Sequence, residues 1–279
     1  MGRVTRRVPS TRIDLSGPGG SLVGGRPDTL AVEEPMEIRV DGTSLSVTMR
    51  TPGDDFDLAI GYLLTEGVIA EAGDVLHAMH CLDEDENGSP TYNVVDITLA
   101  PDAKVDTSRT RRSSYTSSAC GVCGKTSIDA ITAQSRYAVA QDPLRVSPET
   151  VAGLPGALRE RQRVFDRTGG LHAAGLFTAD GELLAVREDV GRHNAVDKVI
   201  GWAGREGRLP LTGHLLAVSG RASFELTQKA VMAGIPALVA VSAPSSLAVE
   251  LAADAGLTLV AFVRPPRMTV YTGGHRLGL

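Results

Sequence analysis

Residues Leu215 to Val263 read LLAVSGRASFELTQKAVMAGIPALVAVSAPSSLAVELAADAGLTLVAFV, and this stretch decides the expected fold. Three short apolar segments (215–218, 237–241 and 257–263) alternate with two segments of helical pattern (224–232 and 247–255). Strands that alternate with helices of this length imply right-handed crossovers and a parallel sheet. In such a sheet, ligands collect at the carboxyl ends of the strands.

Small, hydroxylated or cationic residues follow each of the three predicted strands. They are Ser219-Gly220-Arg221-Ala222-Ser223, Ser242-Ala243-Pro244-Ser245-Ser246 and Arg264-Pro265-Pro266-Arg267. The first two runs open helices, whose free N–H groups suit phosphate, although helix capping by serine also explains any one of them. Together with the arginines, the three runs favour an anionic nucleotide or a pterin phosphate as ligand. The glycine-rich fingerprints of the common nucleotide folds do not occur in the sequence.

The chain before this stretch predicts further strands and helices from its periodicity and its turn residues. They are a hairpin over 38–51 that turns at Asp41-Gly42, a helix from Asp54 or Asp55 to about Gly67, a strand over 92–99, a helix capped by Ser147, a hairpin over 174–186 and a helix that ends the run Asp189–Lys198. The sequence therefore predicts an α/β fold with a smaller N-terminal α+β part.

Length and composition set the expected division of the chain. The 279 residues, 42% of them hydrophobic, are enough to bury a sizeable core. We expect a disordered N-terminal tail over residues 1–25, because this segment is rich in arginine and glycine. An N-terminal α+β part with the cysteine loop is expected over residues 26–145, and an α/β part that binds a cofactor over residues 146–279.

Charge and cysteine content argue against several classes of protein. A net charge of −5 argues against bulk nucleic-acid binding. No apolar run approaches the ~18–20 residues that a membrane-spanning helix needs, and the pair Arg6-Arg7 lacks the apolar segment of an export signal. Three cysteines, a low and odd number, fit a reducing compartment. We expect a cytoplasmic protein without a nucleic-acid or membrane partner.

The pair Cys120-Gly121-Val122-Cys123 holds two thiols close together in a polar, serine-rich region that predicts an exposed loop. Lys125 would favour the reactive thiolate. A structural zinc site needs four ligands, and the third cysteine, Cys81, lies far away in sequence, so no metal site is expected. A thioredoxin-like redox pair, an inert loop pair and a cysteine that carries sulfur as a persulfide are the other interpretations. The pair by itself does not choose among them.

Several separated motifs together resemble the formate dehydrogenase accessory sulfurtransferases over residues 33–272. They are Thr51-Pro52-Gly53 with Asp57-Leu58-Ala59 and Glu66-Gly67, Cys120-Gly121-Val122-Cys123-Gly124-Lys125, Thr168-Gly169-Gly170 with His172, Asp189–Lys198, Ser219-Gly220-Arg221 with Glu225, and Val270-Tyr271-Thr272. The resemblance implies a cytidine deaminase-like three-layer α/β/α fold with a mixed sheet, and a cytoplasmic homodimer.

The resemblance also implies an activity. The protein would accept sulfur from a cysteine desulfurase as a cysteine persulfide and transfer it to the bis-molybdopterin guanine dinucleotide form of the molybdenum cofactor, which formate dehydrogenase needs in sulfurated form. The cysteine that carries sulfur in the family matches Cys120, with Cys123 as the second catalytic cysteine. The cofactor is here a bound substrate. Its guanine end is expected on Phe262, Val263, Arg264, Pro265, Pro266 and Arg267, and further contacts on Ser219, Gly220, Arg221, Arg192 and His193.

Two other functions compete with this one. A zinc deaminase uses His-x-Glu and Pro-Cys-x-x-Cys motifs. In this chain His172-Ala173-Ala174 has alanine in place of the glutamate, alanine precedes Cys120, and the cysteines come before the histidine. Deamination is therefore disfavoured. A non-catalytic carrier of the molybdenum cofactor remains the alternative, and whether the thiols are needed separates it from a sulfurtransferase.

Overall fold

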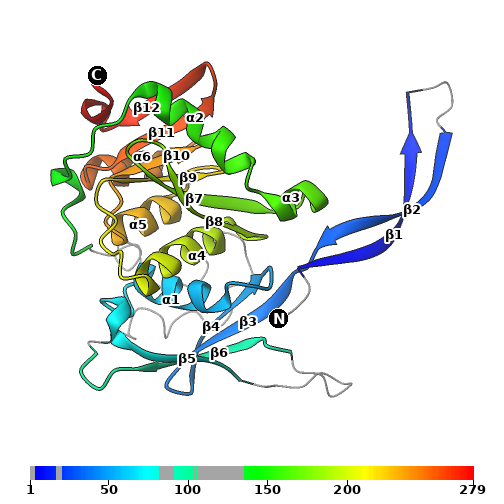
Figure 1. The fold of residues 1–279 in the computed structure, drawn as a ribbon, viewed down its shortest axis with the longest axis horizontal. Helices are drawn as coiled ribbons and strands as arrows, with labels where there is room; N and C mark the ends of the chain where they lie inside the picture. Colours follow the sequence, from blue (N-terminus) through cyan, green and yellow to red (C-terminus); the bar gives the residue numbers. More distant parts are fainter. Residues whose placement is uncertain (1–3, 17–20, 82–90, 104, 106–134) are drawn as a thin grey trace.

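A six-stranded mixed sheet is the centre of the computed structural model, which describes residues 4–16, 21–81, 91–103, 105 and 135–279 (Figure 1). The strand order is β12-β11-β10-β9-β7-β8. These strands are β7 (His172–Thr178), β8 (Leu183–Asp189), β9 (His214–Val218), β10 (Ala237–Ala240), β11 (Thr258–Arg264) and β12 (Arg267–Thr272). Strands β9, β10 and β11 are parallel, as the sequence predicts, whereas β7, β8 and β12 run antiparallel to their neighbours.

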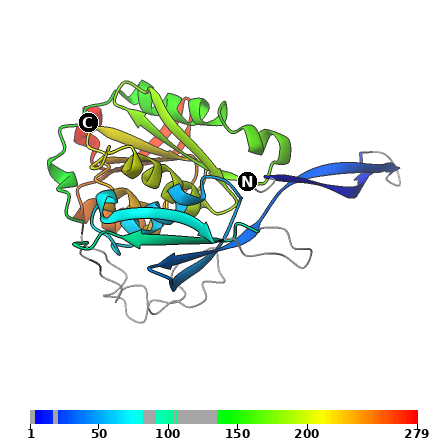
Figure 2. The ribbon, with the colours of Figure 1, turned by 60° about the horizontal axis from the view of Figure 1, so that its bottom comes forward.

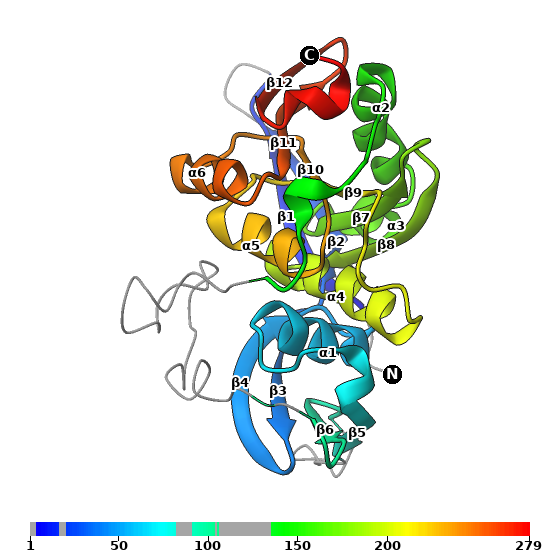
Figure 3. The ribbon, with the colours of Figure 1, turned by 90° about the vertical axis from the view of Figure 1, so that its left-hand side faces the viewer.

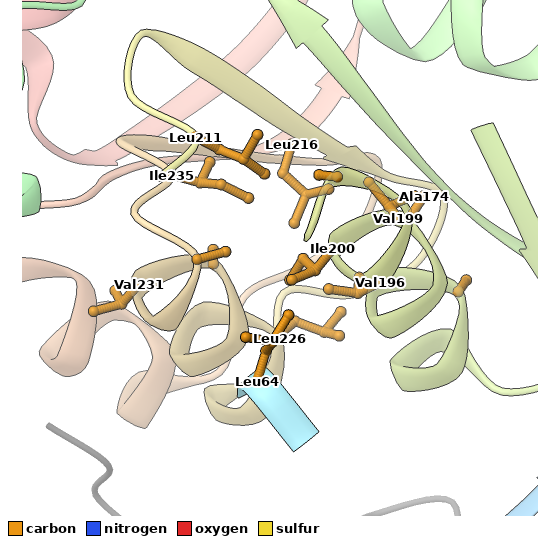
Figure 4. Close-up of a cluster of buried hydrophobic side chains, with 14 of the residues drawn as sticks. Leu64, Ala174, Val196, Val199, Ile200, Leu211, Leu216, Leu226, Val231 and Ile235 are labelled. Atoms are coloured by element: carbon orange, nitrogen blue, oxygen red, sulfur yellow. The ribbon is translucent and has the colours of Figure 1, made fainter. Parts of the chain in front are cut away.

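Helices cover both faces of this sheet. Helix α2 (Pro148–Arg159), which is followed by the short α3 (Arg163–Thr168), packs on one face. Helices α4 (Arg192–Arg205), α5 (Phe224–Met232) and α6 (Ser246–Asp254) pack on the other. Alternation along β9 explains the two cores, because Leu215 and Ala217 pack with α2 while Leu216 and Val218 pack with α4 and α5 (Figure 4). The helix–sheet–helix arrangement confirms an α/β protein, while the cytidine deaminase likeness stays a prediction.

A second sheet of four strands, with the order β4-β3-β6-β5, forms the smaller N-terminal part (Figure 3). Its strands are β3 (Glu34–Val40), β4 (Thr43–Arg50), β5 (Val75–Cys81) and β6 (Val94–Leu99), and α1 (Asp55–Thr65) lies between it and α4. Short 3-10 turns complete the described elements at Ala72–Asp74, Val139–Gln141 and Gly274–Leu277. The predicted hairpin at Asp41-Gly42 is confirmed, since both residues have the positive φ of a tight hairpin turn (48° and 74°).

Helices α1 and α4 join the smaller part to the large sheet. They touch backbone to backbone at Gly61 and Gly201, where an added Cβ would overlap the carbonyl groups of Asp197 and Asp57 respectively. Only glycine allows so close a crossing. The two sheets therefore share one core, in which Met36, Leu58 and Leu216 belong to the same cluster.

Within residues 1–25, where the sequence predicted a disordered tail, the described residues 4–16 and 21–25 lie mostly in strands. Strands β1 (Thr5–Asp14) and β2 (Ser21–Ala31) pair antiparallel as a two-stranded arm that extends away from the body (Figure 2). For these described residues the prediction was wrong. It was based on arginine and glycine content, but backbone pairing between two strands does not need an apolar composition. The division of the chain at residues 25 and 145 otherwise stays a prediction. Among the described residues, no helix is long and apolar enough to cross a membrane.

Candidate functional site

The carboxyl ends of the parallel strands lie side by side, and backbone hydrogen bonds connect the segments that follow them. The Ser242 N–H donates to the Gly220 carbonyl at 3.3 Å, and the Phe262 N–H donates to the Ser242 carbonyl at 3.2 Å. The Ser219 N–H donates to the Ala173 carbonyl at 3.0 Å, because β7 runs antiparallel to β9 and begins at this edge. The predicted strand-end residues thus share one edge of the sheet.

Serine hydroxyls at this edge cap two helices. Ser223 Oγ accepts a hydrogen bond from the Leu226 N–H at the start of α5, and Ser245 Oγ accepts one from the Ala248 N–H at the start of α6. Both runs therefore use a serine for ordinary capping. The exposed side chain of Arg221 lies between the end of β9 and the start of α5.

A histidine–glutamate pair stands beside these caps. His193, in the first turn of α4, places Nε2 at 2.8 Å from Oε2 of Glu225 in α5, and Ser223 Oγ lies within 3.5 Å of both side chains. The two side chains are only 15% and 13% exposed. Among the described residues, the buried Oε1 of Glu225 has no hydrogen-bond partner. One carboxylate oxygen of Glu225 is thus held by His193 and Ser223, and the other oxygen can still accept a hydrogen bond from a ligand.

The side chains of Arg192 and His172 lie next to the backbone of Gly220. A Cβ at Gly220 would be in ordinary van der Waals contact with both, at 3.4 Å from His172 Nδ1 and 4.0 Å from Arg192 Cδ. The buried Nε of Arg192 has no hydrogen-bond partner within the described part of the chain. Burial lowers the pKa of His172, and the positive charge of Arg192 and the His193 ring lower it further. The positive charge of Arg192 and its unpaired Nε suit an anion at this point.

The start of α4 is fixed by a buried carboxylate. Asp189, at the end of β8, is fully buried and accepts hydrogen bonds from the N–H groups of Thr51 and Gly191 and from the amide of Asn194. It also forms an ion pair of 2.7 Å with Lys198, whose Nζ donates to the Thr51 carbonyl. The smaller N-terminal part therefore holds the helix end that carries Arg192 and His193.

The segment Phe262–Arg267 lies at the same edge, two strands away from β9. Phe262 has a positive φ of 52°, its side chain is 43% exposed, and the register of β11 and β12 shifts between Ala261 and Arg264. A bulky residue in this conformation costs of order 1–3 kcal/mol and is typical of functional positions. Val263 turns back into the core, whereas Arg264, Pro265, Pro266 and Arg267 are exposed.

The structure places the predicted cofactor-binding residues at one edge of the sheet, in two separate groups. Arg192, His193, Ser219 and Gly220 meet near the end of β9, while Phe262–Arg267 forms a second group at the end of β11. Cys120 and Cys123, and the predicted exposed loop around them, lie outside the described residues. Cys81 lies at the end of β5 in the other sheet. The described residues contain no group of three or more His, Cys, Asp or Glu side chains that could hold a metal ion.

The sequence places Ser223, His172 and Glu225 in its motifs, but none of the three was among the predicted cofactor-binding residues. All three contact the predicted residues directly. Glu225 lies only six residues after Ser219, in the first turn of the helix that follows the strand. This short spacing could have indicated that Glu225 lies near the strand-end site. His172 reaches the site only because β7 is antiparallel to β9, which the order of the elements does not specify.

The fold and this edge define a mixed α/β protein whose strand ends present cationic and partnerless polar groups suited to an anionic ligand. The FdhD/NarQ family matches residues 31–278, and the chain belongs to that family. This membership confirms the resemblance found in the sequence motifs.

Named relatives cover nearly the whole chain. The sulfur carrier protein FdhD of Streptomyces coelicolor is 57% identical over 280 residues, which cover 100% of this chain and 98% of the relative. Sulfur carrier protein FdhD of Mycobacterium tuberculosis is 58% identical over 255 residues, or 90% of this chain and 92% of the relative.

A solved structure shares the fold. It is the crystal structure of a protein from Desulfotalea psychrophila that is assigned as a formate dehydrogenase accessory protein. The TM-score is 0.74 at 22% sequence identity, and the match covers 99% of this chain and 100% of the other. The fold of this chain thus has an experimental counterpart.

Proposed function

We propose that this protein is a sulfurtransferase that carries sulfur as a persulfide to the bis-molybdopterin guanine dinucleotide cofactor of a formate dehydrogenase. The observation that carries the proposal is membership of the FdhD/NarQ family, with relatives named sulfur carrier protein FdhD at 57–58% identity. The sulfur donor is a cysteine desulfurase, and the protein works in the cytoplasm as a homodimer.

The sulfur chemistry belongs to the cysteine pair. Cys120 accepts the sulfur, because a thiolate is the nucleophile in such exchanges and Lys125, two residues after Cys123, favours the charged form. Cys123 either accepts the sulfur in turn or tunes the reactivity of Cys120. The flanking Gly121 and Gly124 keep side-chain bulk away from both thiols.

The cofactor, as bound substrate, occupies the carboxyl edge of the large sheet. Its phosphates fit beside Gly220, where Arg192 supplies positive charge, its Nε lacks a partner in the described chain, and the His172 ring lies alongside. Its guanine end fits the segment Phe262–Arg267, because the exposed ring of Phe262 offers a stacking surface and Arg264 and Arg267 are exposed at the same turn. The two groups of residues suit the two ends of one elongated ligand.

The mass of the protein after incubation with a cysteine desulfurase and cysteine tests the sulfur step. We expect the native chain to gain one sulfur atom and the Cys120→Ser variant to gain none. Cys81→Ser is the matched control and should gain sulfur normally, since Cys81 lies in the other sheet. Equal gain by the Cys120→Ser and native chains would overturn the assignment of Cys120.

Activation of a formate dehydrogenase separates the sulfurtransferase from a non-catalytic cofactor carrier. We expect the Cys120→Ala variant to remain folded but to activate no enzyme, because the sequence predicts an exposed loop around Cys120 and such a thiol would support little of the core. Full activation by this variant would favour the carrier.

Calorimetry with guanosine diphosphate, a fragment of the cofactor, tests the binding edge. We expect weak binding that Arg221→Ala and Arg267→Ala each reduce, because a lost charge-assisted hydrogen bond costs roughly 1.5–3 kcal/mol, or about ten- to a hundredfold in affinity. Arg161→Ala, an exposed arginine beyond α2, is the control and should bind normally. Absence of binding by the native chain, or unchanged binding by both site variants, would contradict the proposed edge.

A further inference from the structure

The arm formed by β1 and β2 has very little contact with the body of its own chain. It extends outward as a narrow two-stranded ribbon (Figures 1 and 2). At its base β2 packs against α3, and Arg167 of α3 donates a hydrogen bond of 3.1 Å to the hydroxyl of Thr5. The ten residues of β1, at ~3.3 Å each, make a ribbon about 33 Å long, which is long enough to cross the surface of a neighbouring protein.

A ribbon of this kind is not stable by itself. An isolated pair of strands is at best marginally stable in water, because neither face is covered. The apolar side chains near the tip and on β2 are open to solvent, with Ile13 67%, Leu15 81% and Leu30 45% exposed. The arm therefore needs another surface that covers these side chains.

The edges of the arm are poorly suited to extending a sheet. Pro9 on β1 stands opposite Pro27 on β2 in the strand register. Proline has no N–H to donate, so neither edge offers a continuous row of hydrogen-bond donors to another strand. Contact is therefore expected through the side chains on the faces of the ribbon.

The net charge of the arm indicates what kind of partner it suits. The first 31 residues contain five arginines and two aspartates, a net charge of +3, which leaves −8 for the remainder of a chain whose total is −5. Arg6, Arg7 and Arg12 are exposed on the arm. The remainder of a second copy, with its net charge of −8, therefore complements the charge of the arm.

We propose that the arm of each copy crosses to a second copy and packs its apolar and arginine side chains on the acidic body there. Two copies related by a twofold axis exchange two arms, so each contact is made twice. This inference concerns how the proposed homodimer is held together, and it does not depend on sulfur transfer.

Light scattering on the full chain tests the proposal. We expect a native mass of twice the chain mass of 29.2 kDa at micromolar concentration. The double variant Ile13→Asp/Leu15→Asp should weaken association by about a hundredfold or more, because it removes two apolar side chains from the contact. Leu247→Asp, which changes a 48% exposed leucine of α6, is the matched control and should dimerise normally. Both variants should still gain one sulfur atom after incubation with a cysteine desulfurase and cysteine. A loss of dimerisation with normal sulfur gain would show that the arm contact and sulfur transfer are independent.

Photo-cross-linking identifies the occupant. A benzoylphenylalanine at position 13 in an equal mixture of light and heavy isotope-labelled chains should give cross-links of mixed mass. Such cross-links support exchange between copies. A monomeric native chain, cross-links confined to one chain, or a double variant that dimerises as well as the native chain would overturn the proposal, and cross-linking to formate dehydrogenase alone would assign the arm to that partner instead.

Discussion

Two groups of charged side chains, one buried and one partly buried, differ in how many of their polar atoms have hydrogen-bond partners. Between α1, α4 and α5, Lys229 Nζ lies 2.9 Å from both carboxylate oxygens of Asp197, 2.9 Å from the Thr65 hydroxyl and 3.2 Å from Glu66. At the strand-end edge, by contrast, Arg192 Nε has no partner among the residues that the structure describes, and neither does Glu225 Oε1.

The difference separates a structural role from a binding role. A buried polar group without a partner costs free energy, so a fold retains it mainly where a ligand completes the bonding. Burial alone lowers the pKa of Lys229, but the carboxylates of Asp197 and Glu66 outweigh it and raise that pKa above its ordinary value. We therefore assign the Lys229 group to joining the two parts of the protein and the Arg192 group to an anionic ligand.

Breaking the satisfied group should produce the largest effect. We expect Lys229→Met to reduce the free energy of unfolding by about 3–5 kcal/mol, because it leaves Asp197 as an uncompensated buried charge. Urea unfolding measures the change. The double variant Lys229→Met/Asp197→Asn is the control, and it should lose less than the single variant because the buried charge is gone. A loss below about 1 kcal/mol for the single variant would contradict the structural role.

The helix crossing next to this group should be the second most sensitive position. We expect Gly201→Ala to cost about 2–3 kcal/mol, because the new methyl overlaps the backbone of Asp57 and forces α1 and α4 apart. Gly156→Ala in α2 is the matched control. Its Cβ meets open space, and the change should stabilise the helix by roughly 0.5–1 kcal/mol. Equal effects in both variants would show that the crossing is not closely packed.

Removing a cation from the partnerless group should affect binding rather than folding. We expect Arg192→Ala to weaken guanosine diphosphate binding about ten- to a hundredfold, with a change in unfolding free energy within about 1 kcal/mol. Calorimetry and urea unfolding on the same samples measure both quantities. Large destabilisation without a change in affinity would move Arg192 into the structural group.

The smallest expected effect is a pH dependence of binding. Because burial and neighbouring positive charge lower the pKa of His172, the free protein holds this ring neutral at neutral pH. A bound phosphate raises that pKa again, so binding takes up a proton and affinity should rise, by less than about tenfold, as the pH falls from about 7.5 to 5.5. The His172→Gln variant should lose the part of this pH dependence that comes from the ring. Any pH dependence that remains in the variant then measures the titration of the phosphate itself.

The same lowered pKa predicts the sign of a stability effect in the free protein. Between the folded-state pKa and the ordinary value of 6.5, the unfolded chain binds more protons at position 172 than the folded chain does. The contribution of His172 to stability is therefore complete above pH 6.5 and is lost as the pH falls through this window. His172→Gln should remove that slope from a pH series of unfolding experiments.

Periodicity and turn chemistry are local properties, and the sequence by itself determined the elements that depend on them. The parallel strands β9–β11, the hairpin at Asp41-Gly42 and the cap at Ser147 follow from residues close together in the chain. The motifs around Cys120 and Asp189 were specific enough to identify the family. The sequence also located the strand-end residues Ser219 and Gly220, because parallel strands necessarily end at one edge.

Only the tertiary structure decided which distant side chains meet. His172 and Gly220 come together through the antiparallel pairing of β7 and β9, and His193 meets Glu225 through the packing of two helices. The arm was missed because pairing between β1 and β2 satisfies backbone groups without a buried face, so composition gives no sign of it. Lys229 and Asp197 look like surface residues of their helices until α1 covers them, because burial is a property of the assembled fold and not of the local sequence.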